Sequence, residues 1–287
     1  MTVTLPFMQV DVFTDRPFLG NPVAVILDAD GLDTGTMQRI ARWTYLSETT
    51  VVLRPDAAGT DYALRIFTPD RELPFAGHPT LGSARAAIAA GRATPRDGRL
   101  VQQCAAGLVP IRVEPGGTRL SFEVPPSRTT PLGADDAAAI ARALGLPGAA
   151  PRFEAIDVGP VWITAALADA AAVLALRPDM AALDAIGRRL GVTGVTVHGP
   201  DRSGASGADI AVRSFAPAAG VPEDPVCGSG NACVAIQRRA AGARDAYVAA
   251  QGEALGRAGR IAVRYRGEAI EVGGETVVCV EGTLRVA

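Results

Sequence analysis

Two short segments place glycines where a helix is expected to begin. The segments GHPT (residues 77–80) and GSGN (residues 228–231) each lie between an expected strand and an expected helix of small residues. The first backbone N–H groups of a helix lack intrahelical acceptors, and the helix dipole is positive there, so anions are favoured. We therefore expect the amides at Gly77 and Gly228 to bind a substrate carboxylate or a developing enolate. Two ordinary glycine-rich helix starts are the alternative.

An acid and a histidine are the first candidates for proton transfer. Glu48 lies in the segment LSETT, between an expected helix and an expected strand. A partly desolvated carboxylate there can carry a proton in both directions, whereas helix capping or full solvation is the alternative. His78 follows Gly77, where the helix dipole disfavours imidazolium. It is therefore expected to act as a neutral hydrogen-bond partner or proton relay, unless its role is structural.

The second glycine segment follows an acid and a cysteine. Asp224 lies in the segment EDP, where it can orient His78, bind a substrate hydroxyl or amine, or be a surface acid favoured by the dipole. Cys227 directly precedes Gly228, a position where a thiol can have a lowered pKa and act as a base. Ala76 occupies the matching position before Gly77 and cannot exchange protons. A symmetrical two-thiol mechanism is therefore not expected.

The elements around these segments repeat. RIFTPDRELPFAGHPTLGSA begins at Arg65, and RSFAPAAGVPEDPVCGSGNACVA begins at Arg213. The arginines are 148 residues apart, and Gly77 and Gly228 are 151 residues apart. A constant spacing near half the chain length indicates a duplication. If the copies are related by a pseudo-twofold axis, the two glycine segments face each other across one cleft.

Hydrophobic patterning gives each copy several strands and one small-residue helix after the glycines. We expect an α+β fold of two pseudo-symmetric halves, each a mainly antiparallel curved sheet or barrel around a central helix. The proline-rich stretch at 125–127 is the expected linker. The expected domains are residues 1–124, completed by a C-terminal strand at 275–287, and residues 125–274. The expected helices are Thr34–Trp43, Thr80–Ala90, Ala134–Leu144, Met180–Leu190 and Asn231–Ala241.

Composition excludes several classes of function. The 287 residues carry a net charge of −2, with no basic stripe, so a nucleic-acid partner is not expected. No apolar run approaches the roughly 20 residues needed to span a membrane, and the first residues are not expected to form a secretion signal. The chain has four cysteines, no CxxC pair and two histidines, which favours reduced thiols, a cytoplasmic location and no metal site. Cys104, Cys233 and Cys279 are expected to be buried and inert.

Four motifs in the chain are MQVDVFTDRPFLGNPVAVIL, LSETTVV, RIFTPDRELPFAGHPTLGSA and EDPVCGSGN. Through them the chain resembles the PhzF-like phenazine-biosynthesis proteins along essentially its whole length. The resemblance implies the diaminopimelate-epimerase fold, an active-site cleft between two similar halves, a homodimer, and no metal or organic cofactor. It implies that Glu48 takes and returns the proton and that His78, Asp224 and Ser229 assist. It also implies that the amides of Gly77 and Gly228 hold the substrate carboxylate.

The chain departs from this resemblance at Cys227, where relatives often carry threonine. Amino-acid epimerases and proline racemases of the same fold have cysteine there, with a second cysteine where this chain has Ala76. The leading hypothesis is a cofactor-independent isomerase that shifts a proton on a small unsaturated carboxylate, such as a dihydro-hydroxyanthranilate or another antibiotic-pathway acid. A racemase or epimerase using Cys227 and a non-catalytic small-molecule-binding protein are the alternatives. Further side chains that could shape the site are Tyr45, Arg65, Asp70, Arg71 and Arg213.

Overall fold

The computed structural model describes residues 2–204 and 206–286. The chain divides into two compact units, Met1–Glu123 with Gly273–Ala287, and Val124–Val272. No helix of the described residues combines the length and apolar character that crossing a membrane requires.

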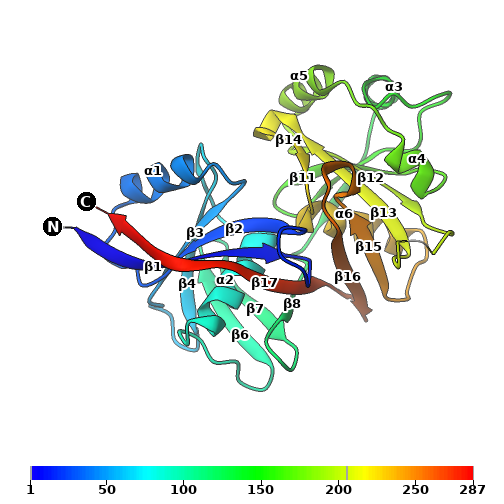
Figure 1. The fold of residues 1–287 in the computed structure, drawn as a ribbon. Helices are drawn as coiled ribbons and strands as arrows, with labels where there is room; N and C mark the ends of the chain where they lie inside the picture. Colours follow the sequence, from blue (N-terminus) through cyan, green and yellow to red (C-terminus); the bar gives the residue numbers. More distant parts are fainter. Residues whose placement is uncertain (1, 205, 287) are drawn as a thin grey trace. The chain divides into compact units, whose positions relative to one another are not determined.

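The first unit is a closed barrel of eight strands. Strand β1 pairs with β2 and β17, and the ring continues through β3, β4, β6, β7 and β8 back to β17. Strands β1 and β17 run antiparallel side by side, from Val3 opposite Val286 to Val12 opposite Thr276 (Figure 1). The elements are β1 (Val3–Val12), β2 (Asn21–Ile26), α1 (Thr34–Thr44), β3 (Thr49–Leu53), β4 (Tyr62–Phe67), β5 (Glu72–Leu73), α2 (Gly77–Ala89), β6 (Arg99–Cys104), β7 (Gly107–Val113), β8 (Arg119–Glu123) and β17 (Ala269–Val286).

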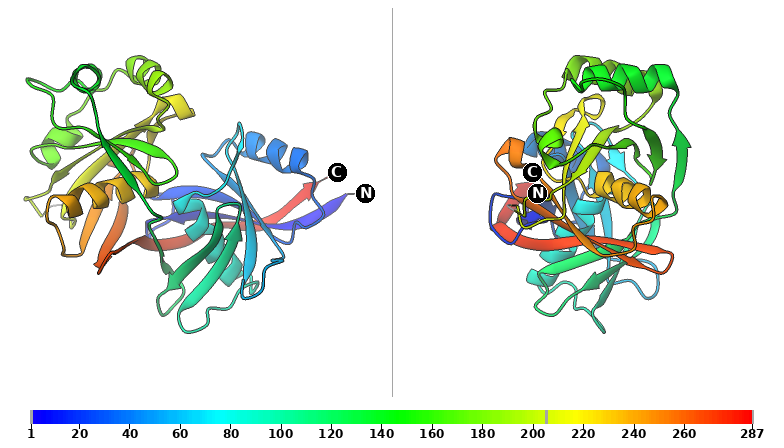
Figure 2. Two further views of the ribbon diagram at one scale, coloured as in Figure 1. Left: turned by 180° about the vertical axis from the view of Figure 1, so that it is seen from behind. Right: turned by 90° about the vertical axis from the view of Figure 1, so that its right-hand side faces the viewer.

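Helix α2 occupies the inside of this barrel (Figure 2). It contacts β1, β2, β3, β4, β6 and β8. Leu81, Ala84 and Ala86 are completely buried. A side chain at Gly82 would lie 2.3 Å from Val23 on β2. Small residues therefore let the strands close around the helix at the density of a protein interior.

The second unit repeats this plan. Strands β9 to β13 pair in order, β13 pairs with both β14 and β15, and β15 pairs with β16. Helix α6 is buried against β11, β12 and β16, and an apolar core lies under α3, α4 and α5. The elements are β9 (Arg128–Pro131), α3 (Ala134–Ala143), β10 (Glu154–Asp157), β11 (Val161–Ala166), α4 (Ala170–Leu174), α5 (Met180–Leu190), β12 (Gly194–Pro200), β13 (Ile210–Ala216), η1 (Pro217–Ala219), β14 (Val221–Asp224), α6 (Gly228–Ala240), β15 (Tyr247–Gln251), η2 (Glu253–Leu255) and β16 (Gly259–Arg266).

The architecture confirms the expected α+β class with a sheet around a central helix in each half. Two of the expected helices begin earlier than patterning indicated. Helix α2 begins at Gly77 rather than Thr80, and α6 begins at Gly228 rather than Asn231. The glycines are thus the first helical residues. Patterning also missed the strands β6 and β15, whose glutamines and alanines interrupt the apolar alternation.

Strand pairing aligns the two copies residue by residue. In the first unit Val51 of β3 lies opposite Arg65 of β4, and in the second Val197 of β12 lies opposite Arg213 of β13. Counting back three residues from each valine makes Gly194 the counterpart of Glu48. Counting from the helix starts makes Cys227 the counterpart of Ala76 and Ser229 the counterpart of His78. The duplicated frame therefore carries different chemical groups in its two halves.

Candidate active site

In the first unit, Glu48 and His78 lie in contact. The Oε2 atom of Glu48 is 3.2 Å from Nε2 of His78, and the side chains are 16% and 6% exposed. The two residues are 30 positions apart in the sequence, yet the fold brings the predicted acid to the start of α2. The contact thus sets a carboxylate oxygen directly against a buried ring nitrogen.

Local structure explains the position of Glu48. Helix α1 starts at an Asp33 cap, whose carboxylate accepts the N–H of Thr36. It ends at Tyr45, whose left-handed conformation (φ 58°) turns the chain out of the helix. Strand β3 begins at Thr49 and pairs in parallel with β2. Glu48 is therefore the last residue before a buried strand.

His78 is held neutral by its surroundings. Burial lowers the pKa of this imidazole from 6.5 to about 3, and a hydrogen bond to the carbonyl of Pro22 opposes only part of that effect. Its Nδ1 atom lies 3.4 Å from the side-chain nitrogen of Asn21 at the start of β2. A neutral imidazole carries one N–H and one lone pair, so it can donate a hydrogen bond to an ionised Glu48 or accept one from its protonated form. The neutral state suits a hydrogen-bond partner, and the role of a proton relay stays a prediction.

The two helix starts are capped differently. Ala76, the N-cap residue of α2, provides no side-chain cap, whereas Cys227 caps α6 by accepting the N–H of Gly230 on its sulfur at 3.2 Å. A side chain at Gly77 would come within 2.7 Å of the ring of Phe122, so only glycine fits there. Both helices thus present backbone N–H groups and a positive dipole end suited to an anion.

The thiol of Cys227 is not the activated base that its helix position suggested. It is 2% exposed, and burial together with the negative charge of Asp224 raises its pKa well above the ordinary value of 9.0. Hydrogen bonds from Ser229 and from the N–H of Gly230 oppose these two effects only in part. Cys227 therefore stays protonated at neutral pH and acts as a helix cap.

The carboxyl of Asp224, which contacts Cys227, has a raised pKa. Burial raises its pKa from 3.8 to about 6, assisted by the charge of Glu223 and opposed by hydrogen bonds from Cys227 and the N–H of Val226. The Asp224 side chain is half-buried rather than fully exposed as a surface acid would be. A carboxyl that titrates near neutral pH can bind a substrate group in either protonation state.

Ser229 is oriented by a residue that sequence reasoning missed. The indole N–H of Trp162 donates to its hydroxyl at 2.9 Å, and Trp162 is 2% exposed. This leaves the hydroxyl hydrogen of Ser229 available to donate to another group. Trp162 lies on β11, far from the glycine segment in sequence, and no local pattern marks it. Asn21, beside His78, was missed for the same reason.

The arginines singled out by the repeat have internal partners. Arg65 binds Glu72, and Arg213 binds Glu223, each through two hydrogen bonds. The fold thus uses both arginines to hold strands. Tyr45 is 85% exposed at the end of α1.

The remaining three cysteines lie in different surroundings. Cys233 is fully buried, while Cys104 and Cys279 are only partly buried, contrary to expectation. Across residues 2–204 and 206–286, no cluster of three or more histidine, cysteine, aspartate or glutamate side chains is arranged to hold a metal ion.

The structure groups the predicted residues by unit. Glu48, His78 and Gly77 come together in the first unit. Asp224, Cys227, Gly228 and Ser229 come together in the second unit, within one strand-to-helix connection. A joint site formed by the two groups remains a prediction.

Comparison with known proteins points to one family. The family model described as phenazine biosynthesis-like protein (PhzC-PhzF) matches residues 10–282. The chain is 38% identical to antisense-enhancing sequence 1 of Schizosaccharomyces pombe, over 96% of this chain and 97% of that protein. It is 36% identical to trans-2,3-dihydro-3-hydroxyanthranilate isomerase of Pseudomonas aeruginosa, over 96% and 98%. The crystal structure of the PhzF-family protein of Bacillus anthracis superposes with a TM-score of 0.84 at 22% identity, covering 98% and 99% of the two chains.

Proposed function

The chain belongs to the PhzC-PhzF family of phenazine biosynthesis-like proteins and is an isomerase, and from this we propose its reaction. We propose that it acts on a small molecule and shifts a proton on an unsaturated carboxylate. Glu48 is the group that removes and returns the proton. The substrate class is that of trans-2,3-dihydro-3-hydroxyanthranilate, on which several relatives act by name. In the reaction one C–H bond breaks, another forms along the same conjugated system, and no atom is gained or lost.

The contact between Glu48 and His78 carries this proposal. A carboxyl 3.2 Å from a neutral imidazole, with both side chains largely buried, can take a proton from one carbon and return it to another. The imidazole steadies the carboxyl by donating to its ionised form or accepting from its protonated form. These two side chains supply the proton transfer, so the proposed reaction needs no cofactor.

The second unit supports a one-base mechanism. The counterpart of Glu48 is Gly194, where a side chain would lie 2.1 Å from the carbonyl oxygen of Phe215. No acid fits that position in this fold. The counterpart of His78 is Ser229, a hydroxyl that does not titrate near neutral pH. We propose that Asp224, Ser229 and the amides at Gly77 and Gly228 bind and orient the substrate.

The two alternatives receive less support. Racemisation through Cys227 requires a thiolate, and the pKa of this thiol is raised rather than lowered. The non-catalytic alternative is set aside because the relatives are named as isomerases over nearly their full length. We also propose a cytoplasmic homodimer without a nucleic-acid partner. The four cysteines have free thiols, which suits a reducing compartment.

The proposal is tested by turnover in D₂O. Trans-2,3-dihydro-3-hydroxyanthranilate is incubated with the protein, and the product is analysed by NMR and mass spectrometry. We expect solvent-derived deuterium on the carbon that gains the proton, because the protonated carboxyl of Glu48 exchanges with solvent before it returns its proton. Conversion of this acid and of related unsaturated cyclic carboxylates at no more than the uncatalysed rate would reject the proposed substrate class.

A further inference from the structure

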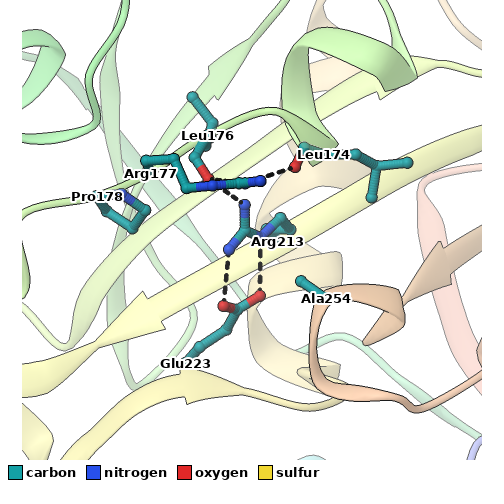
Figure 3. Close-up of a pocket in the computed structure, with 7 residues that line it drawn as sticks. All are labelled: Leu174, Leu176, Arg177, Pro178, Arg213, Glu223 and Ala254. Atoms are coloured by element: carbon teal, nitrogen blue, oxygen red, sulfur yellow. Dashed lines mark hydrogen bonds and ion pairs between the residues drawn. The ribbon is translucent and has the colours of Figure 1, made fainter.

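The pair formed by Arg213 and Glu223 is the most buried ion pair with a described geometry in the second unit. Its two charge-assisted hydrogen bonds are both 2.8 Å long, and the side chains are 7% and 8% exposed (Figure 3). The remaining guanidinium nitrogen donates to the carbonyls of Leu176 and Val173. The guanidinium also lies 4.9 Å from the ring centre of Phe215. Such a two-point pair fixes direction as well as distance.

The ion pair lies next to Asp224, both along β14 and across the pairing of β14 with β13. Arg213 precedes Ser214 on β13, and Ser214 lies opposite Asp224 on β14. Glu223 precedes Asp224. The main-chain carbonyl of Asp224 accepts a hydrogen bond from Gln251 at 3.0 Å. The backbone that carries Asp224 is thus held by the ion pair and by one side-chain amide.

The segment that carries Asp224 is a short strand with irregular pairing. Strand β14 has only four residues, and its pairing with β13 is interrupted by a register shift after Ser214. Beside it lies a hollow of about 480 Å³, lined by the ion pair, Arg177 and the apolar residues Leu174, Leu176, Pro178 and Ala254 (Figure 3). A short, irregular strand next to open space needs another restraint, and the ion pair provides one.

The duplication contains a second copy of the device. Arg65 binds Glu72 through two bonds of 2.7 Å, and its guanidinium lies 5.1 Å from the ring centre of Phe67. Glu72 and Glu223 each stand five residues before the first glycine of the following helix. The first pair is more exposed, at 28% and 36%, and Leu73 stands where the second copy has Asp224. It therefore serves as a matched control.

We propose that Arg213 and Glu223 are positioning residues, which hold Asp224 and the start of α6 in the geometry that substrate binding requires. The inference rests on the proposed function for its catalytic consequence, while the placement of Asp224 can be measured without turnover. Arg213 and Glu223 themselves need not touch the substrate.

The test uses Arg213→Lys, which keeps the charge but loses the two-point geometry. We expect kcat to fall roughly tenfold to a hundredfold with little change in KM, as for a misplaced active-site group. The carboxyl titration of Asp224 is followed by ¹³C NMR and assigned with Asp224→Asn. Its pKa should fall from about 6 toward 3.8 as the displaced side chain meets water. Arg65→Lys should leave the Asp224 titration unchanged and kcat within about twofold, since exposed ion pairs contribute little.

An Arg213→Lys protein that melts at a lower temperature but keeps its kcat and its Asp224 titration would overturn the inference, because the pair would then serve stability alone. If Arg213→Lys does not fold, the neutral double variant Arg213→Met with Glu223→Gln replaces it. There the fall in kcat at unchanged KM is the deciding readout, because loss of the Glu223 charge by itself lowers the pKa of Asp224. If the natural sequence does not convert the substrate, the proposed function fails. The Asp224 titration in Arg213→Lys still decides the inference.

Discussion

Replacing Asp224 with asparagine should make the second unit more stable at alkaline pH. The folded protein raises the pKa of this carboxyl from 3.8 to about 6, so folding disfavours its charged form. The folded state therefore holds the proton more tightly than the unfolded state, and stability falls as the pH rises from about 4 to 6. Asparagine is neutral at every pH and can still accept the N–H of Val226, so it avoids this loss.

The size of the effect follows from the shift. A rise from 3.8 to about 6 corresponds to roughly 3 kcal/mol of lost unfolding free energy at pH 8, and partial solvent exposure of the side chain reduces it. About half of that loss has already occurred at pH 5, where the unfolded chain is ionised. The advantage of Asp224→Asn should therefore be about 1 kcal/mol larger at pH 8 than at pH 5.

Tryptophan fluorescence can report this unit alone. The chain has two tryptophans, of which Trp162 is 2% exposed in the second unit and Trp43 is 75% exposed in the first. In a Trp43→Phe background, urea unfolding followed by Trp162 gives the free energy of unfolding at both pH values. An equal difference between Asp224→Asn and its parent at pH 5 and pH 8 would refute the reasoning, since the carboxyl would then titrate alike in both states.

Variants at three further sites test separate parts of the account. Cys227→Ala should destabilise the protein by about 1 kcal/mol through loss of the α6 cap. Cys227→Ser should stay within a few tenths of a kcal/mol of the parent in thermal unfolding. Equal losses of stability in the two variants would contradict the capping role. Trp162→Phe, which frees the Ser229 hydroxyl, should raise KM severalfold with the fold intact by circular dichroism, and an unchanged KM would contradict its positioning role. Gly194→Ala should destabilise by about 1–3 kcal/mol or more, because its Cβ would meet a carbonyl oxygen at 2.1 Å. Gly133→Ala, with no atom within 4 Å of the new Cβ, is its control, and similar losses in the two would contradict the steric argument.

The sequence allowed the duplication and its consequences to be predicted. Gly77 and Gly228 are separated by nearly the same number of residues as Arg65 and Arg213, which identified equivalent helix starts. Small residues after each glycine indicated a central helix inside a sheet. Both features follow from local rules of backbone conformation and packing. The glutamates that bind Arg65 and Arg213 were also within reach of the sequence, since each stands five residues before a helix glycine. Their significance becomes clear only once the strands are paired.

Burial and long-range contacts lie beyond sequence patterns. The contact between Glu48 and His78 depends on the fold of three strands and a helix. The thiol of Cys227 was expected to have a lowered pKa from its helix position alone, but burial and the charge of Asp224 reverse the direction. Local sequence gives the dipole effect, whereas desolvation depends on the whole tertiary structure.

The most direct test of the one-base account compares two variants on trans-2,3-dihydro-3-hydroxyanthranilate. Glu48→Gln keeps the shape of the side chain but cannot accept a proton, and we expect kcat to fall at least about a thousandfold. Cys227→Ser keeps a cap but removes the thiol, and kcat should stay within about threefold of the parent. A Glu48→Gln protein with near-parental kcat, or a collapse of activity in Cys227→Ser alone, would contradict the assignment of proton transfer to Glu48.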